Sequence, residues 1–430
     1  MLNSKQGLLF SVENIFDIHP LKNYETLFGF LELLIPQEPR HHGAGRPKIP
    51  KISLLKALIY KNLRGLLTLS DLVQDLSCNP SLLIKCGFLI DEPPPTKETF
   101  SSFLRNTEHS FFTDIKKSIV LELVKLKELN AKLLSIDSAP IKANVKENNL
   151  KTSHPNRFDK HHIPKGDPDA RMGVTILFKP NDLFSKQVQY FWGYRTHVVS
   201  DAITELPIIE RTLPANIHDS KVCISLLKEI IELGLSPEGI TADAAFDSQE
   251  ILSFIINDLK AKPYIARNPR NKPTNFQLSP KGYRICIAGL PMRNWGTFKD
   301  GNKRTRKKFV CPIKLSKKFS KLYPSCPVSH PKFHNPQGCT AYLRIDQDIR
   351  KTIDYGSPKF DKIYNMRTCS ERVFSRIINL ALRNIPVKGI AAISNYLTLA
   401  HISALLVALT AVKTGNRNKI RYFKSFIKDL

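Results

Sequence analysis

The sequence is short of acidic residues. It holds 38 Asp and Glu against 65 Lys and Arg, so its formal net charge is +27 and its pI is near 9.7. This imbalance favours a polyanionic partner, because Lys and Arg displace the counterions that condense on phosphates. A proteome with lysine-rich surfaces would give the same total. The basic residues are clustered, however, in runs at 267–272, 303–308, 314–321 and 413–428, which argues for a polyanion-binding surface.

An N-terminal signal sequence is also lacking, since Met1–Pro20 contains Lys5, Glu13 and Asp17 and no sustained apolar core. The stretch 389–412 has no Asp, Glu, Lys or Arg and is long enough to span a bilayer. It carries several polar side chains, including His401. We therefore expect a buried helix packed on a sheet, with a membrane span as the minor alternative.

Cysteine is scarce, and no two of the eight cysteines form a Cys-x-x-Cys pair. Half of them lie close together and have two histidines nearby: Cys286, Cys311, Cys326, Cys339, His330 and His334. In a basic intracellular protein such a group suggests a structural Zn²⁺ site rather than disulfides. Without a Cys-x-x-Cys knuckle, four separately buried free thiols remain nearly as good an interpretation. The other four are predicted to pack between helices: Cys78, Cys86, Cys223 and Cys369.

Two apolar runs end at aspartates. Residues 133–138 predict a strand that ends at Asp137, because the following Ala139-Pro140 should not continue a central strand. Residues 239–243 have the same pattern and end at Asp243, and a helix is predicted from 247 to 259. A single Asp at a strand end is more often a turn or cap residue. Two at matching positions indicate a place where a divalent ion could be held against a substrate phosphate.

A third carboxylate, Glu371, lies in a predicted helix that also contains Tyr364 and Arg367. These three residues stand at i, i+3 and i+7, so they share one helix face. A solvated Arg–Glu pair would explain two of them. Because Tyr364 and Phe374 flank the charges, the face is predicted to be partly buried. The three carboxylates are therefore grouped as one candidate metal site.

The pattern Tyr364-x-x-Arg367-x-x-x-Glu371-Arg372, preceded by two strand-end aspartates, resembles the signature of bacterial insertion-sequence DDE transposases, which have a ribonuclease-H-like catalytic core. The segment 191–197 (Phe-Trp-Gly-Tyr-Arg-Thr-His) is similar to a strand of that family. Segments 201–207 and 215–220 resemble those that follow it. The resemblance extends over roughly residues 45–412.

The chain departs from the family pattern at one position. Many relatives carry Lys or Arg seven residues after the glutamate, where this sequence has Ile378. Arg376 and Arg383 are the candidate substitutes.

The resemblance implies that Asp137, Asp243 and Glu371 hold two Mg²⁺ ions, for which Mn²⁺ can substitute, with Asp137 bridging both. Arg367 is expected to grip a DNA phosphate with two parallel hydrogen bonds. The other candidate DNA contacts are Tyr364, Arg372, Arg195 and His197. Of these, Tyr364 is favoured only weakly, because an aromatic residue at a helix start more often belongs to the core. His197 is either a phosphate contact or a packed core residue. Asp201 and Asp219 are explained by a turn and by a helix N-cap.

The expected fold is α/β: a ribonuclease-H-like mixed sheet with helices on both faces, preceded by an all-helical block and interrupted by an insertion. Five strands are predicted, at 133–137, 171–178, 189–200, 240–243 and 263–266, with a helix at 219–233. Helices are predicted in the first block at 23–34, 53–66, 70–76 with Ser70 as cap, 79–86 and 96–129. The predicted domains are 1–130 (helical, DNA-binding, with a basic linker 36–50), 131–267 (first part of the core), 268–360 (basic insertion), 361–412 (rest of the core) and 413–430 (basic tail). A helical brace is an equal alternative for the first block.

The predicted function is that of a transposase that binds the ends of an insertion sequence, cleaves DNA and joins it to target DNA by two-metal phosphoryl transfer. Its expected partners are double-stranded DNA and a second copy of the chain, with no membrane, in the bacterial cytoplasm at the nucleoid. Two alternatives remain. One is a metal-dependent nuclease without strand transfer, and the other is a domesticated DNA-binding protein without activity.

Overall fold

The computed structural model describes residues 21–35, 48–151, 153–155, 157–179, 182–268, 283–301, 304–344, 349–355, 357–382 and 385–423. The predicted linker residues 36–47, Arg383 and the end of the basic tail lie outside these ranges. The chain forms two compact units, one of residues 1–266 and 354–430 and the other, here called the insertion unit, of residues 267–353.

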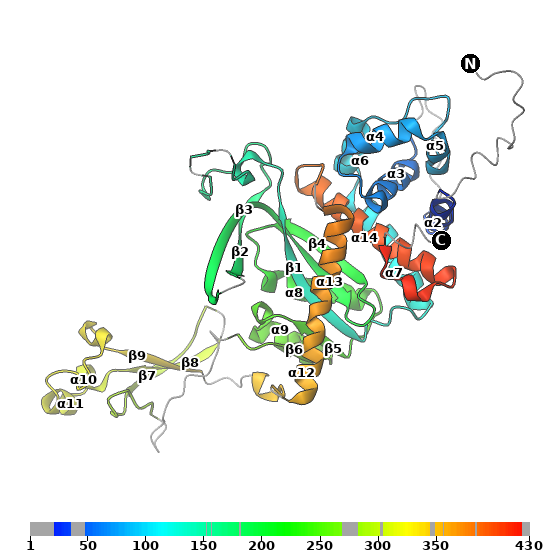
Figure 1. Cartoon of the computed structure of the whole chain (residues 1–430). Coiled ribbons are helices and arrows are strands. Elements are labelled where there is room, and N and C mark those ends of the chain that lie inside the picture. The colour runs from blue at the N-terminus through cyan, green and yellow to red at the C-terminus, as the bar shows by residue number, and fades with distance from the viewer. Residues whose placement is uncertain are drawn as a thin grey trace, which may run out of the picture. The chain divides into compact units, whose positions relative to one another are not determined.

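The larger unit is built on a six-stranded mixed sheet with the order β2-β3-β1-β5-β6, in which β4 also pairs with β3 (Figure 1). β1 is parallel to β5, as the sequence predicted, and β6 is parallel to β5. β1 is antiparallel to β3. β4 was not predicted; it pairs with the second half of β3, while β2 pairs with the first. The strands are β1 (Leu133–Lys142), β2 (Arg171–Lys179), β3 (Asp182–Asp201), β4 (Pro207–Pro214), β5 (Gly239–Ala242) and β6 (Lys262–Ile265).

β1 does not end at Asp137, and that prediction was wrong. The strand runs on through Pro140 to Lys142. Its pairing with β5 stops at Ile136, whereas its pairing with β3 continues to the end. One edge of β1 is therefore free beyond Ile136, and a proline that cannot donate a ladder hydrogen bond is tolerated there.

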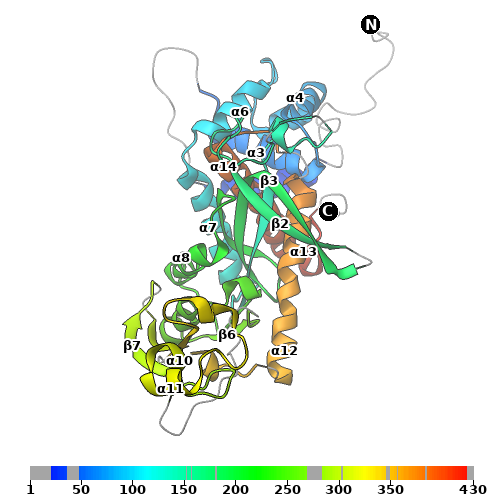
Figure 2. The same ribbon diagram turned by 90° about the vertical axis from the view of Figure 1, so that its left-hand side faces the viewer.

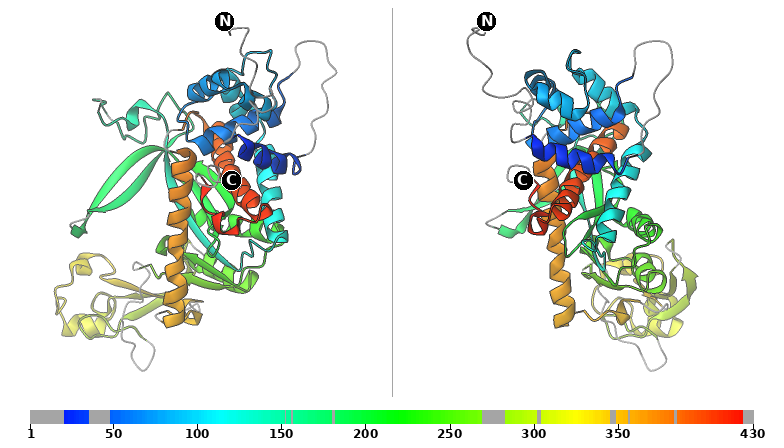
Figure 3. Two further views of the ribbon diagram at one scale, coloured as in Figure 1. Left: turned by 45° about the vertical axis from the view of Figure 1, so that its right-hand side comes forward. Right: turned by 90° about the vertical axis from the view of Figure 1, so that its right-hand side faces the viewer.

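Helices cover both faces of this sheet. α8 (Asp219–Glu232) contacts β1, β3 and β4, and α13 (Thr368–Ile377) contacts β1 and β3. α12 (Pro358–Tyr364), a short 3₁₀ turn and α13 follow one another as a continuous rod beside the sheet (Figure 3). Figure 2 shows the same rod next to β2 and β3 from another side. The predicted helix from 247 to 259 is α9 (Gln249–Ser253) and a following π turn.

The N-terminal helices pack around one long apolar helix, α14 (Ile390–Lys413). α14 contacts α2, α3, α6, α7 and β4. It is long and apolar enough to cross a membrane, yet 83% of its most apolar window is buried inside the protein. The expectation of a buried helix against the sheet is thus confirmed. The surrounding helices are α2 (Lys22–Glu32), α3 (Lys51–Arg64), α4 (Leu69–Cys78), α5 (Pro80–Cys86), α6 (Lys97–Asn106) and α7 (His109–Lys125).

Three local predictions were wrong. The cap of α4 is Thr68, which forms a reciprocal capping box with Asp71, and Ser70 lies inside the helix. The cap of α8 is His218, so Asp219 is the first helical residue. Cys78 is exposed at the end of α4, whereas Cys86, Cys223 and Cys369 are buried as predicted.

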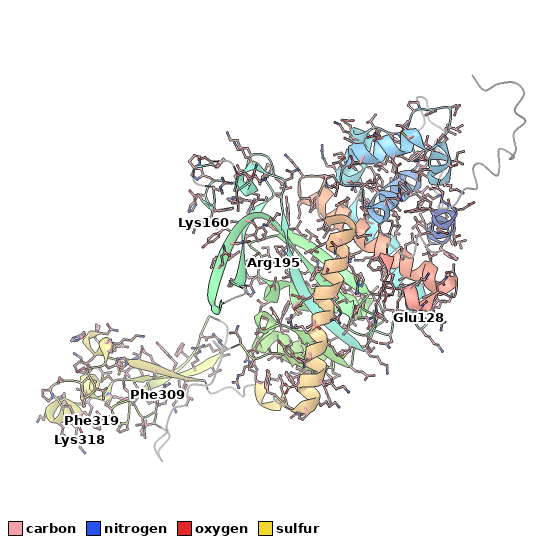
Figure 4. All side chains as sticks on the ribbon, viewed as in Figure 1. Glu128, Lys160, Arg195, Phe309, Lys318 and Phe319 are labelled. Atoms are coloured by element: carbon pink, nitrogen blue, oxygen red, sulfur yellow. The ribbon has the colours of Figure 1, made fainter. Side chains whose placement is uncertain are left out.

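The insertion unit has its own antiparallel sheet, β7 (Arg293–Lys299), β8 (Thr305–Val310) and β9 (Thr340–Arg344), in that order. Two short helices, α10 (Pro312–Leu315) and α11 (Lys317–Leu322), lie between β8 and β9 in the chain. Phe309 at the end of β8 is fully buried (Figure 4). Trp295 on β7 is 50% exposed and does not belong to this core.

Candidate active site

The sheet places Asp137 and Asp243 next to each other. The last paired residues of β1 and β5 are Ile136 and Ala242, and each aspartate follows directly. Asp243 caps a 3₁₀ turn, because its Oδ1 accepts a hydrogen bond of 2.8 Å from the N–H of Ala245. Asp137 Oδ1 accepts a hydrogen bond of 2.8 Å from the N–H of Ser138. Both carboxylates are thus held by the backbone at the point where two parallel strands separate.

Glu371 reaches the same strand through α13. The hydroxyl of Ser135 on β1 lies 2.6 Å from that of Ser370, the residue before Glu371. Ser135 and Asp137 are two residues apart on a strand and point to the same face of the sheet. The helix that carries the glutamate therefore lies over the face that carries the first aspartate. The carboxylate of Glu371 is 60% exposed.

Arg367 stands between two of the carboxylates. Its Nη2 lies 3.2 Å from Glu371 Oε1, and its Nη1 lies 4.0 Å from Asp137 Oδ2. The guanidinium carbon is 6.0 Å from the centre of the Tyr364 ring, which in turn stacks on Phe360. The predicted shared face of Tyr364, Arg367 and Glu371 is present, and it faces the carboxylate site.

The surroundings of Asp137 shift its pKa in both directions. Burial raises the pKa of Asp137 to about 6, and the nearby negative charge of Asp243 adds to the effect. The Ser138 N–H and the Arg367 guanidinium act in the opposite direction and limit the rise. A partly buried carboxyl whose pKa is raised by a neighbouring negative charge marks a site where a cation would be stabilised.

The three carboxylates supply the hard oxygen ligands that Mg²⁺ prefers. In the part of the chain that the structure describes, no three Cys, His, Asp or Glu side chains already stand together at metal-ligand geometry. Asp137 and Asp243 are adjacent, while Glu371 is engaged by Arg367. The donor set fits a divalent ion, provided that the side chain of Glu371 turns away from Arg367.

Arg195 and His197, predicted as DNA contacts, lie on the other face of the sheet. In the β1–β3 register Ser138 is opposite His197 and Pro140 is opposite Arg195, so these residues alternate with Asp137. Arg195 donates a hydrogen bond of 3.1 Å to the Ser138 hydroxyl, and its Nη1 is 3.5 Å from Asp219. His197 is 1% exposed, and burial lowers its pKa to about 4. A neutral, enclosed imidazole argues against a direct phosphate contact. Figure 4 marks Arg195 on β3.

Arg372 and Arg376 are engaged in an ion-pair cluster around Glu205. Arg372 Nε and Arg376 Nη2 lie 2.8 Å and 2.7 Å from the two carboxylate oxygens, and Arg421 Nη1 lies 3.5 Å from one of them. Glu205 is buried. The cluster joins α13 to the β3–β4 turn. The Asp201-x-x-x-Glu205 pattern was the one feature of the sequence that could have pointed to it. Arg376 is thus a structural partner rather than a free substitute for a basic residue at position 378.

A ribonuclease-H-like mixed sheet with two aspartates at adjoining strand positions, and a glutamate on a helix against the same strand, defines the DDE class of proteins. The family described as "Transposase DDE domain" matches residues 179–406, more than half of the chain, and the family described as "Transposase domain (DUF772)" matches residues 11–106. The chain belongs to the DDE transposases of insertion sequences. Asp137 lies outside both matched ranges, so its place in the site depends on the strand register.

Among solved structures, the chain matches a cryo-EM structure of a piggyBac transposase synaptic complex with hairpin DNA. It is 13% identical, with 97% of this chain and 83% of that chain covered, at a TM-score of 0.36. No curated protein matches the chain. The family assignment therefore rests on the two family matches.

Proposed function

We propose that this transposase binds the two ends of its insertion sequence, cleaves the DNA there and joins the freed 3′ ends to target DNA. The observation that supports this most directly is the position of the three acids. Asp137 and Asp243 follow the last paired residues of two adjacent strands, and Arg367 lies between Asp137 and Glu371. The DDE transposase family generally uses divalent metal ions, and the carboxylates of this site are the donors for them.

Each of the three acids has a distinct part in the proposed reaction. Asp137, partly buried and central, would contact both ions, while Asp243 and Glu371 would each complete the shell of one. Bound Mg²⁺ would supply two effects: it makes the attacking oxygen of water or of a 3′ hydroxyl nucleophilic at neutral pH, and it stabilises the leaving oxygen. Asp137 must lose its proton before it can serve as a ligand.

Arg367 would exchange partners in this reaction. When Glu371 turns to bind an ion, the guanidinium is released from its 3.2 Å pair and can grip the scissile phosphate. The Tyr364 ring lies next to the guanidinium and is itself held in place by stacking on Phe360. The same arginine therefore restrains the site without DNA and positions the substrate in its presence.

The charge distribution supports DNA as the partner. Residues 267–353 hold 20 Lys and Arg and three Asp, so +17 of the formal net charge of +27 lies in the insertion unit. On β7 and β9, Trp295, Phe298 and Tyr342 are 40 to 50% exposed. Exposed aromatic rings among cations are typical of nucleic-acid-binding surfaces. We propose that this unit contacts the DNA backbone beyond the cleavage site.

The test uses the purified full chain and a labelled DNA duplex taken from the flank of its reading frame, where short inverted repeats mark the element ends. With Mg²⁺, the wild type is expected to nick this DNA. Asp137→Asn, Asp243→Asn and Glu371→Gln should each lower cleavage at least about 100-fold, because each removes a metal ligand. All three should still shift the duplex in a gel containing EDTA.

The matched control is Asp361→Asn, which neutralises an exposed acid on α12. It should cleave like the wild type. Undiminished cleavage by Asp137→Asn or by Asp243→Asn would show that the acids are not the catalytic set.

The second candidate function, a nuclease without strand transfer, uses the same acids and is separated by one further assay. A duplex with a pre-cleaved 3′ hydroxyl is mixed with a supercoiled target plasmid. Joined product supports the transposase. Cleavage of intact ends without any joined product supports the nuclease. Mass measurement of the DNA-bound species tests the proposed second copy of the chain.

A further inference from the structure

The insertion unit has a very small core for its charge. Its described apolar side chains that are buried are Met292, Phe309, Val310, Pro312 and Ile313, together with Cys311. Every residue of β7 is exposed. A unit of 87 residues with +17 formal charges and so few buried side chains repels itself and gains little from burial. Small units of this kind usually need a disulfide or a metal ion to hold them together.

Four cysteines gather at one end of its sheet. Val310 pairs with Thr340 as the last pair of β8 and β9, so Cys311 and Cys339 follow side by side. Close approach is confirmed at Gly338, where an added Cβ would lie 3.2 Å from Cys311 Sγ. The hairpin closed by the Ile285–Pro291 bridge leads directly into β7, whose first residue, Arg293, pairs with Val310, so Cys286 lies at the same end of the sheet. Cys286 and Cys326 are also near enough to Cys339 to interact with it electrostatically.

Tight turns carry two of the four cysteines. The C=O of Cys286 accepts the N–H of Gly289 at 2.9 Å, and the C=O of Cys326 accepts the N–H of Ser329 at 3.0 Å. Gly289 and Ser329 both have positive φ, of 74° and 47°, as a sharp reversal requires. These turns fix each cysteine backbone without embedding the side chain in a core.

Exposure separates the two interpretations of the cysteine group. Cysteines that only fill a core are expected to be fully buried, as Cys86, Cys223 and Cys369 are. In the group, Cys286, Cys326 and Cys339 are each partly exposed. Four sulfurs from separate segments that meet near the surface have the composition of a structural zinc site.

The two histidines are not part of the group. His330 Nδ1 accepts the N–H of Lys332 at 3.1 Å and caps a 3₁₀ turn. The His334 ring packs edge-on against Phe333.

We propose that Cys286, Cys311, Cys326 and Cys339 together bind one structural Zn²⁺ ion that holds the insertion unit in its fold. Because no three of these sulfurs stand at ligand geometry yet, binding requires the turns at 286–289 and 326–329 to close onto the ion. The ion replaces four thiol protons, which leave to solvent, so the formed site carries −2 among 20 basic residues. Metal binding and folding of this unit would then be coupled.

The experiment measures metal in the purified full chain without any DNA. Elemental analysis should find about one zinc per chain in the wild type and in Cys78→Ser, which alters an exposed cysteine elsewhere. Cys286→Ser and Cys326→Ser should hold at least tenfold less. Exchange of zinc for Co²⁺ should give the thiolate-to-metal absorption of a tetrahedral sulfur site in the wild type.

Chelation provides a measurement that does not depend on how the variants fold. A strong chelator added to the wild type should expose residues 267–353 to limited proteolysis and leave the larger unit intact, and added zinc should restore protection. Wild-type protein purified with less than about a tenth of a zinc per chain, with four thiols still free to react, overturns the proposal. So does a disulfide within the group. Neither result bears on cleavage by the three acids.

Discussion

The hydroxyl of Ser135 lies 2.6 Å from the hydroxyl of Ser370, although the two residues are 235 positions apart in the chain. This contact joins the centre of the sheet to α13 with two of the smallest side chains. Asp137 is two residues beyond the first serine, and Glu371 is the residue after the second. The spacing between the first and third acids is therefore set by how closely the helix can approach the strand.

Enlarging Ser370 should separate the acids without altering any of them. Ser370→Leu places a branched side chain in a fully buried gap and should push α13 away from β1, so cleavage is expected to fall by at least about tenfold. Ser370→Ala keeps the close approach and should retain most of the activity. The control is Ser375→Leu on the exposed side of the same helix. Equal cleavage by Ser370→Leu and the wild type would show that this contact does not position Glu371.

The raised pKa of Asp137 predicts a cost in stability. Burial and Asp243 raise this pKa from 3.8 to about 6, so between these values the folded chain binds more protons than the unfolded chain. The free energy of unfolding then decreases as the pH rises through this window, and the full penalty is present above it. In EDTA at pH 8, Asp137→Asn should therefore be more stable than the wild type by roughly 1–3 kcal/mol.

Thermal unfolding at pH 4 and at pH 8 measures this effect. The advantage of Asp137→Asn should be small at pH 4, where the wild-type carboxyl is already protonated. Mg²⁺ should raise the midpoint of the wild type at pH 8 and leave that of the variant unchanged, since a ligand stabilises only the state that binds it. A variant that is less stable than the wild type at pH 8 would contradict the assignment of the buried charge.

Arg367 should contribute to DNA binding through a bidentate contact. Arg367→Ala is expected to weaken binding of the cleavable duplex about tenfold to 100-fold, as loss of a hydrogen bond between charged groups predicts. Arg367→Lys should bind nearly as weakly, because an ammonium group cannot form two parallel bonds. The comparison is Lys362→Ala, which removes an exposed charge from α12. If Arg367→Lys binds DNA as tightly as the wild type, the arginine acts only as a point charge.

The parts of the fold that the sequence predicted correctly are those with a strong local signal. Residues 133–136 and 239–242 are apolar runs, and their parallel pairing brought the two aspartates together as expected. α14 was predicted as buried from its polar content, and its Asn395 amide donates hydrogen bonds of 2.9 Å to the C=O groups of Leu104 and Thr107. In these segments the residues that form the element also determine what it packs against.

The errors arose where tertiary pairing decides the outcome. β4 begins and ends with proline and was not predicted, yet its position beside β3 makes it a strand. Pro140 was predicted to end β1, yet it is tolerated because β5 is short and leaves that edge of β1 unpaired. The length of β5 cannot be inferred from the residues of β1. Arg195 and His197 were predicted as candidate DNA contacts, and only the register shows that they face the side of the sheet opposite Asp137. Spacing along the chain contains none of this information.

The buried ion pair between α7 and β4 should stabilise the fold only when both charges are present. Lys116 on α7 forms a salt bridge with Glu210 on β4, and the two side chains are 7% and 2% exposed. Lys116→Met leaves the buried carboxylate without its cationic partner and should cost about 3–5 kcal/mol. The double variant Lys116→Met, Glu210→Leu removes both charges and should recover most of that loss. The neighbouring Lys117 is exposed, so Lys117→Met should change stability by less than about 0.5 kcal/mol. Thermal midpoints of the four proteins decide the matter: if the double variant is no more stable than Lys116→Met, the destabilisation comes from lost packing and not from an isolated charge.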